Sequence, residues 1–160
     1  GPGGDAESGL ARLAVDGSVS GGMRYLEAGR ILLEEAGRYR EAAGYLERAL
    51  QSDIPEQEKA RARYYIGNAR SLGYEISSAL GTPDDGLRKG AVDEWWKGAS
   101  GAPGTEWGAK SHRAWLDYKL DEWDIHGKLK RLNEFLGYYG ASGGHYWWAQ
   151  EKKLESLYGG

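Results

Sequence analysis

The chain has 160 residues, a length that suits one domain with a hydrophobic core. It contains no cysteine, which excludes disulfides, thiolate zinc sites and cysteine nucleophiles and leaves the cellular compartment undetermined. A formal charge of −3 argues against nucleic acid as a partner, and no apolar run approaches the roughly 20 residues of a membrane span.

Residues 1–22 are rich in glycine and serine, and they predict a flexible tail with at most one short helix. Gly1 and Pro2 are typical of the residues that remain after a purification tag is removed. The chain is therefore interpreted as part of a longer protein. Residues 23–160 are expected to form a single helical domain.

Amphipathic helices are predicted on either side of Gly37, which is placed to end the first one as a C-cap. The second helix carries Ala42, Leu46 and Ala49 at helical spacing. Because so few residues separate the two helices, they are expected to pack antiparallel as a hairpin.

A third helix is predicted to begin near Pro55, which suits a first helical turn. Residues 76–80 either extend this helix or begin a separate short one, and the sequence leaves both alternatives open. The predicted core face consists of Ala62, Tyr65, Ile66, Ala69, Leu72 and Gly73.

Residues 81–85 predict the start of a fourth helix, with Thr82 as its cap. Residues 98–104 are rich in glycine and predict a loop. No window alternates with the period of a strand, so the expected fold class is all-α. Three further helices are predicted, at about 105–123, 125–139 and 147–158.

Two segments, AGRYREAAGYLERALQSDIP (36–55) and IGNARSLGYE (66–75), resemble the two halves of a tetratricopeptide repeat. The matching residues are Gly37, Tyr39, Ala42, Leu46, Ala49 and Pro55 in the first segment and Ile66, Gly67 and Ala69 in the second. The resemblance implies antiparallel helical hairpins stacked as a short tetratricopeptide-like α-solenoid with a C-terminal capping helix. A different α-solenoid is the alternative.

Proteins of this family bind peptides or protein partners in a groove lined by the first helix of each hairpin. The resemblance therefore implies a non-enzymatic adaptor that binds a protein or peptide and uses no cofactor. Asn68 stands where some members have an asparagine that binds a terminal carboxylate, although Tyr64 replaces the expected basic residue. The expected contact residues are Arg30, Arg61, Tyr64, Asn68, Trp115 and Lys119. The alternative is that the stripe on the third helix is only a solvated flank.

All seven tryptophans lie between Trp95 and Trp148. In the pairs Trp95–Trp96 and Trp147–Trp148, one member should be partly exposed, because neighbours on a helix point about 100° apart. Burial is expected for Trp95, Trp115, Trp123 and Trp147. Two alternative functions follow: a structural module that forms a homo-oligomer through its tryptophan-rich half, and a carbohydrate-binding domain that uses Trp96, Trp107 and Trp148.

No catalytic or metal site is predicted. His112, His126 and His145 belong to no catalytic or metal-binding motif, and each is expected to be structural or exposed. Arg63 and Arg70 are interpreted as solvent-facing or ion-paired residues rather than as ligand contacts.

Overall fold

A computed structural model describes residues 2–140 and 143–159 of the chain. Within these residues the chain forms eight α-helices, one 3-10 turn and no strand, which confirms the prediction of an all-α fold. Gly1, part of the expected tag remnant, lies outside the described residues. The elements are α1 (Pro2–Val15), α2 (Gly21–Ala36), α3 (Tyr39–Leu50), α4 (Glu56–Ala79), α5 (Asp85–Gly101), α6 (Glu106–Lys119), η1 (Leu120–Glu122), α7 (Ile125–Tyr139) and α8 (Gly143–Tyr158).

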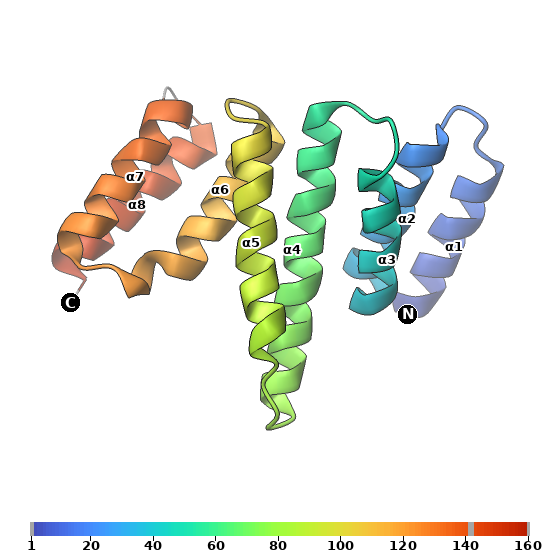
Figure 1. Cartoon of the computed structure of the whole chain (residues 1–160), viewed down its shortest axis with the longest axis horizontal. Coiled ribbons are helices and arrows are strands. Elements are labelled where there is room, and N and C mark those ends of the chain that lie inside the picture. The colour runs from blue at the N-terminus through green and yellow to red at the C-terminus, as the bar shows by residue number, and fades with distance from the viewer. Residues whose placement is uncertain (1, 141–142, 160) are drawn as a thin grey trace.

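The helices follow one another in chain order along the long axis of the molecule (Figure 1). Each helix contacts the next, and α7 packs more extensively against α8 than against α6. Helix α4 also contacts both α2 and α6, so these three helices form one layer. The result is an arrangement of helical hairpins whose pairwise packing is compatible with a helical repeat. None of the described helices is long and apolar enough to cross a membrane.

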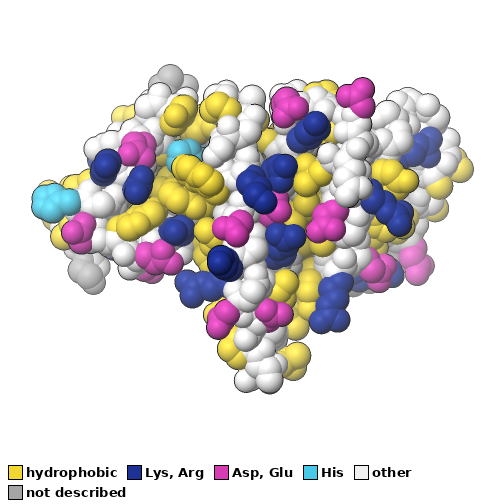
Figure 2. Space-filling view, in the orientation of Figure 1, with side chains coloured by type: hydrophobic (Ala, Val, Ile, Leu, Met, Phe, Trp, Pro, Cys, Tyr) yellow, Lys and Arg dark blue, Asp and Glu magenta, His cyan; other side chains and the backbone are white. Residues whose placement is uncertain are grey.

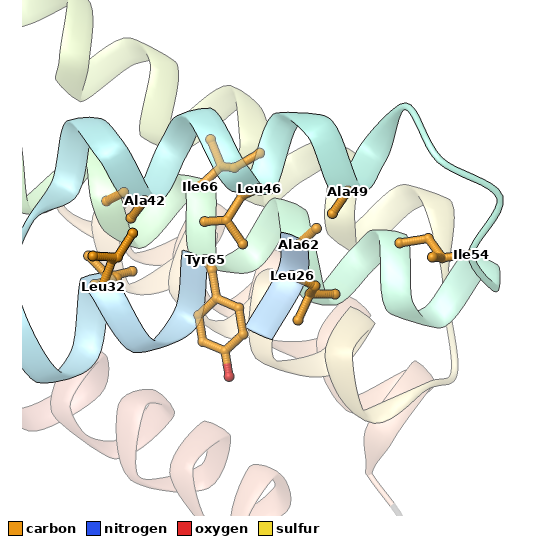
Figure 3. Packing of buried hydrophobic residues seen from close by; sticks show 11 residues of the cluster. Leu26, Leu32, Ala42, Leu46, Ala49, Ile54, Ala62, Tyr65 and Ile66 are labelled. Carbon is orange, nitrogen blue, oxygen red and sulfur yellow. The ribbon is translucent and has the colours of Figure 1, made fainter. Parts of the chain in front are cut away.

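The first core lies between α2, α3 and α4 (Figure 3). Leu26, Leu46 and Ile66, one from each helix, are completely buried there. On α2, Leu26 faces the core, while its neighbour Tyr25 is 37% exposed. The predicted core face of α4 is confirmed by the burial of Ala62, Tyr65, Ile66, Ala69 and Gly73.

Small residues allow neighbouring helices to approach closely. At Gly67 of α4 the indole ring of Trp95 lies against the backbone, and a Cβ at this position would overlap the ring. Gly29 of α2 faces Leu46 of α3 in the same way. Each glycine lowers helix propensity by about 1 kcal/mol relative to alanine, and the close packing that it permits offsets this cost.

The N-terminal segment contains more helix than the sequence predicted. Instead of a flexible tail with at most one short helix, the structure has the 14-residue helix α1, which packs against α2 and buries Ala6. The guanidinium of Arg24 donates hydrogen bonds to the carbonyls of Leu13 and Val19, each at 3.0 Å. These tertiary contacts outweigh the low helix propensity of a segment rich in glycine.

Several helix ends also differ from the prediction. Residues 76–79 extend α4, which decides between the two alternatives that the sequence left open. Helix α5 begins after Asp84, whose carboxylate accepts a hydrogen bond from a backbone N–H of the first turn, so Asp84 rather than Thr82 is the cap. Helix α5 then continues to Gly101, into the predicted loop at residues 98–104.

The second core lies between α6, α7 and α8 and is largely aromatic. Leu116 and Phe135 are completely buried there. The imidazole of His112 packs edge-on against Phe135, with ring centroids 5.2 Å apart, and His112 is 8% exposed. Burial lowers the pKa of His112 to about 4, although the charge of Glu134 acts in the opposite direction. The imidazole is therefore neutral at pH 7.

Each tryptophan pair has one buried and one exposed member, as predicted. Trp95 is buried and Trp96 is 46% exposed. In the second pair the assignment was wrong, because Trp148 is buried and Trp147 is 68% exposed. Trp107 is partly buried in the contact between α4 and α6, so the three tryptophans of the carbohydrate alternative do not form one exposed row.

Replacing Gly67 with alanine is expected to destabilise the protein by about 1–3 kcal/mol, because the added methyl group overlaps the Trp95 ring. Gly44→Ala is the matched control, since no atom lies within 4 Å of an added Cβ in α3 at that position. The control should stabilise the protein by up to about 1 kcal/mol through helix propensity. Urea denaturation measures both free energies of unfolding. Equal changes in the free energy of unfolding for the two variants would contradict the close approach at Gly67.

The free energy of unfolding is expected to fall as the pH is lowered from 6.5 to about 4, because the unfolded chain binds a proton on His112 that the folded chain excludes. This one group should contribute up to about 3 kcal/mol to the fall. Urea titrations across this pH range should show that the free energy of unfolding depends less steeply on pH in His112→Phe than in the parent chain. The exposed His126 provides the control substitution His126→Phe. Parallel curves for all three proteins would contradict the burial of a neutral imidazole.

Candidate functional site

Two of the predicted contact residues, Arg30 and Arg61, meet at a single carboxylate. Glu27 of α2 lies 2.9 Å from Arg30 and 2.6 Å from Arg61, and Arg61 also lies 3.3 Å from Glu58. Burial raises the pKa of Glu27, but the hydrogen bonds and charges of the two arginines outweigh this effect, and the pKa lies below its ordinary value. Arg61 therefore joins α4 to α2, whereas Arg30 pairs with Glu27 within α2.

Aromatic rings surround the Arg61 guanidinium. The guanidinium lies over the rings of Tyr65 and Trp107, at 5.7 and 5.3 Å from their centroids. Tyr64, another predicted contact residue, packs against the same two rings at 5.5 and 5.8 Å. This cluster links α4 to α6, and it places the Tyr64 side chain at the junction of the two helices.

Asn68 has a structural role within the α4–α5 hairpin. Its side-chain oxygen accepts a hydrogen bond at 3.2 Å from the indole nitrogen of Trp95. The same indole N–H lies 3.3 Å from the carbonyl oxygen of Tyr64. No local pattern predicts this contact, because the residues that make it are 27 positions apart.

Trp115 and Lys119 lie on another side of the molecule. Trp115 packs against Trp96 of α5 with ring centroids 4.5 Å apart, and the Lys119 ammonium lies over the Trp115 ring at 5.7 Å. Two positions along a helix correspond to a rotation of about 200°, so Trp115 points away from the side of α6 that carries Arg113. The structure thus does not bring the predicted contact residues together in one groove.

One buried carboxylate forms ion pairs with the other two arginines of α4. Glu94 of α5 is only 7% exposed, and it lies 3.2 Å from Arg63 and 3.3 Å from Arg70. Figure 2 shows charged side chains of both signs gathered over α4 and α5. These contacts confirm the interpretation of Arg63 and Arg70 as ion-paired residues that bind the two helices to each other.

A cavity of about 350 Å³ opens between α4, α6 and α8, and we call it the basic groove. It contains one predicted contact residue, Tyr64. The other lining residues were not predicted from the sequence, although Lys110, Arg113 and Asp117 follow helical spacing on α6. The lining residues are Tyr64, Lys110, Arg113, Ala114, Asp117 and His145.

The cations of the basic groove lie over tryptophan rings. The Lys110 ammonium is 4.4 Å from the centroid of Trp107, and the Arg113 guanidinium is 4.8 Å from that of Trp148. Among the described residues, neither cation has a carboxylate within 4.0 Å. Their charge is therefore not neutralised by an ion pair within the described part of the chain.

Asp117 and His145 of the groove each lie beside a charged side chain. Asp117 lies 3.6 Å from the ammonium of Lys152. Burial lowers the pKa of Lys152, but the hydrogen bond and charge of Glu155 and the charge of Asp117 raise it above its ordinary value. The Nε2 atom of His145 lies 3.1 Å from a carboxylate oxygen of Glu106, while its Nδ1 atom is buried without a hydrogen-bond partner.

The groove therefore combines two cations with the rings of Tyr64 and His145, beside the carboxylate of Asp117. Such a surface can bind carboxylates through charge and apolar groups through the rings. Among the described residues, no group of three or more histidine, aspartate or glutamate side chains is placed to hold a metal ion.

Comparisons with known proteins identify no relative, so any functional assignment depends on the geometry of the site. No family model matches the chain, and no curated protein or solved structure matches it either. The likeness to the tetratricopeptide repeat thus rests on the residues of the hairpins and on the order in which the helices pack.

Proposed function

We propose that the chain is a tetratricopeptide-like scaffold that binds an acidic segment of a partner protein in the basic groove. The observation that carries the proposal is the pair of cations, Lys110 and Arg113, that lie over tryptophan rings without a carboxylate partner among the described residues. The proposed activity is binding rather than catalysis.

Small residues at the helix contacts support the repeat assignment. Gly29, Gly67 and Gly98 occupy the points where α2 meets α3, α4 meets α5 and α5 meets α6, and a Cβ at each would overlap a neighbouring side chain. The layer of α2, α4 and α6 corresponds to the helices that line the binding groove in the tetratricopeptide family. Tyr64 and Lys110 belong to this layer.

The chemistry of the groove favours a segment with both acidic and apolar residues. Lys110 and Arg113 are three positions apart on α6, so they lie on the same face and can contact one carboxylate or two adjacent ones. Tyr64 and Ala114 supply apolar surface beside them. Because the cations already lie over tryptophan rings, little side-chain freedom remains to be lost when a ligand binds.

The test is a selection from a random peptide library displayed on phage, with the whole chain as the target. The selected peptides should be enriched in aspartate and glutamate next to an apolar residue. Charge reversal in the double variant Lys110→Glu, Arg113→Glu should weaken binding of the selected peptides by at least about tenfold. Raising the salt from about 50 to 200 mM should weaken binding to the parent chain. Calorimetry measures the affinities.

The matched control is Lys89→Glu, Lys130→Glu, which makes the same charge change at exposed positions of α5 and α7. Circular dichroism checks that both double variants are folded. The proposal is wrong if both double variants lose affinity equally, or if the selected peptides carry no acidic residues.

A second candidate function, self-association, is favoured by the outer face of α8. Trp147 and Leu154 are 68% and 58% exposed and lie seven positions apart, on one side of the helix. Leu157 and Tyr158, 47% and 81% exposed, continue the same stripe. An apolar stripe on the last helix of a stack is typical of a surface that a further helical layer covers.

If α8 mediates self-association, light scattering after gel filtration should give a mass that rises with protein concentration. The double variant Trp147→Glu, Leu154→Glu should remain monomeric, because charges cannot be buried in the shared interface. The control, Val15→Glu, Leu80→Glu, places two glutamates at exposed apolar positions away from α8. A parent chain that stays monomeric at millimolar concentration would exclude this second function.

A further inference from the structure

A second cavity lies apart from the basic groove, and we call it the aromatic pocket. It has a volume of about 240 Å³ and shares no lining residue with the groove. Figure 2 shows hydrophobic side chains gathered beside a histidine over α6 and α7, in the region of this pocket. The lining residues are Trp96, Ala99, Ser100, Pro103, His112, Tyr138 and Tyr139.

Three aromatic rings of the pocket stand at steep angles to the imidazole of His112. The plane of His112 makes an angle of 89° with Trp96 and 80° with Tyr139, and both centroids lie 6.2 Å from its own. Tyr138 lies at the same distance from His112 with an angle of 62°. Rings that meet at such angles form the separate walls of a cage rather than a flat stack.

Neighbouring groups hold these walls in place. The Tyr139 hydroxyl accepts a hydrogen bond at 3.2 Å from the backbone N–H of Gly104. Trp96 packs against Trp115, and Phe135 packs behind both His112 and Tyr139 at 5.2 and 5.1 Å. The walls formed by Trp96, His112 and Tyr139 therefore exist before any ligand arrives, so binding does not have to organise them.

The pocket is aromatic but carries no charge of its own. No lysine, arginine, aspartate or glutamate lines it. Elsewhere, Trp107, Trp115, Trp123 and Trp148 each have a lysine or arginine of the chain over the ring. Within the described residues, no such cation lies over the rings of Trp96, Tyr138 or Tyr139. The faces of these rings that no other ring covers are available to a cation from outside, and the neutral His112 does not repel one.

We propose that the aromatic pocket binds a quaternary ammonium group, as found in choline. Aromatic faces attract cations, and cages of such rings suit an ammonium whose charge is spread over methyl groups. A primary ammonium fits less well, because it needs hydrogen-bond acceptors for three N–H groups and no carboxylate lines the pocket. The volume lies below the roughly 300–1,000 Å³ of pockets for drug-sized ligands, which favours a compact group.

The test is a titration of the whole chain with choline chloride, followed by two-dimensional NMR at constant chloride concentration. The indole N–H signal of Trp96, assigned from the Trp96→Leu spectrum, should shift with a saturable curve. The neutral isostere 3,3-dimethylbutan-1-ol has the same shape without the charge, and it should bind at least about tenfold more weakly if the rings recognise the cation. Equal affinity for the two compounds would overturn the proposal.

Substitutions test whether choline binds in the aromatic pocket. Trp96→Leu and Tyr138→Leu should each weaken choline binding by about tenfold or more, because each removes one wall of the cage. Trp147→Leu is the matched control, since Trp147 is exposed on α8 outside the pocket. Circular dichroism confirms that the variants are folded. No saturable shift in the parent chain, or the same loss in the control as in Trp96→Leu, would refute the site.

A parallel experiment distinguishes two sources of the same ligand group. Sedimentation with phosphatidylcholine vesicles tests whether the pocket takes the ammonium from a lipid headgroup, and phosphatidylglycerol vesicles serve as the control lipid. If the chain binds both choline and phosphatidylcholine vesicles, and Trp96→Leu loses both activities, the pocket takes the ammonium from the lipid headgroup. Binding of choline alone assigns the free cation. Vesicle binding that persists in Trp96→Leu would mean that the pocket does not recognise the headgroup.

Discussion

The contact between Trp95 and the backbone of α4 at Gly67 determines how the rest of the chain is arranged. Since Gly67 has no side chain, the indole can lie against the helix and donate hydrogen bonds to the Tyr64 carbonyl and the Asn68 side chain. The neighbouring Glu94 binds two arginines of α4 and fixes the same helix pair. Because α4 and α5 both contact α6, the geometry of this hairpin decides where α6 lies.

Helix α6 in turn separates two chemically different surfaces. Lys110 and Arg113 place their charges on the side toward α4 and α8, where tryptophan rings support them. His112, on the opposite side, is buried among aromatic rings and stays neutral at pH 7, so the aromatic pocket has no cation of its own. A net charge of −3 for the whole chain conceals this separation, because acidic residues elsewhere outnumber the basic ones.

Local pattern was enough to predict the helices and much of the core. Leu46 and Ile66 were recognised as buried, because their spacing repeats with the period of a helix. Trp147 and Trp148 were assigned the wrong way round, since either residue fits an apolar face when the neighbouring helix is unknown. The basic groove was found only in part, through Tyr64, because its remaining walls come from α6 and α8.

The sequence by itself determined the all-α class and the order of the helices, because both follow from the residues within each helix and its ends. The tertiary structure decided which side chains meet. Arg61 was expected in a binding groove, yet it is bound to Glu27, 34 positions earlier, because packing of α2 on α4 brings the two charges together. Such pairings depend on how whole helices pack, and local periodicity carries no information about them.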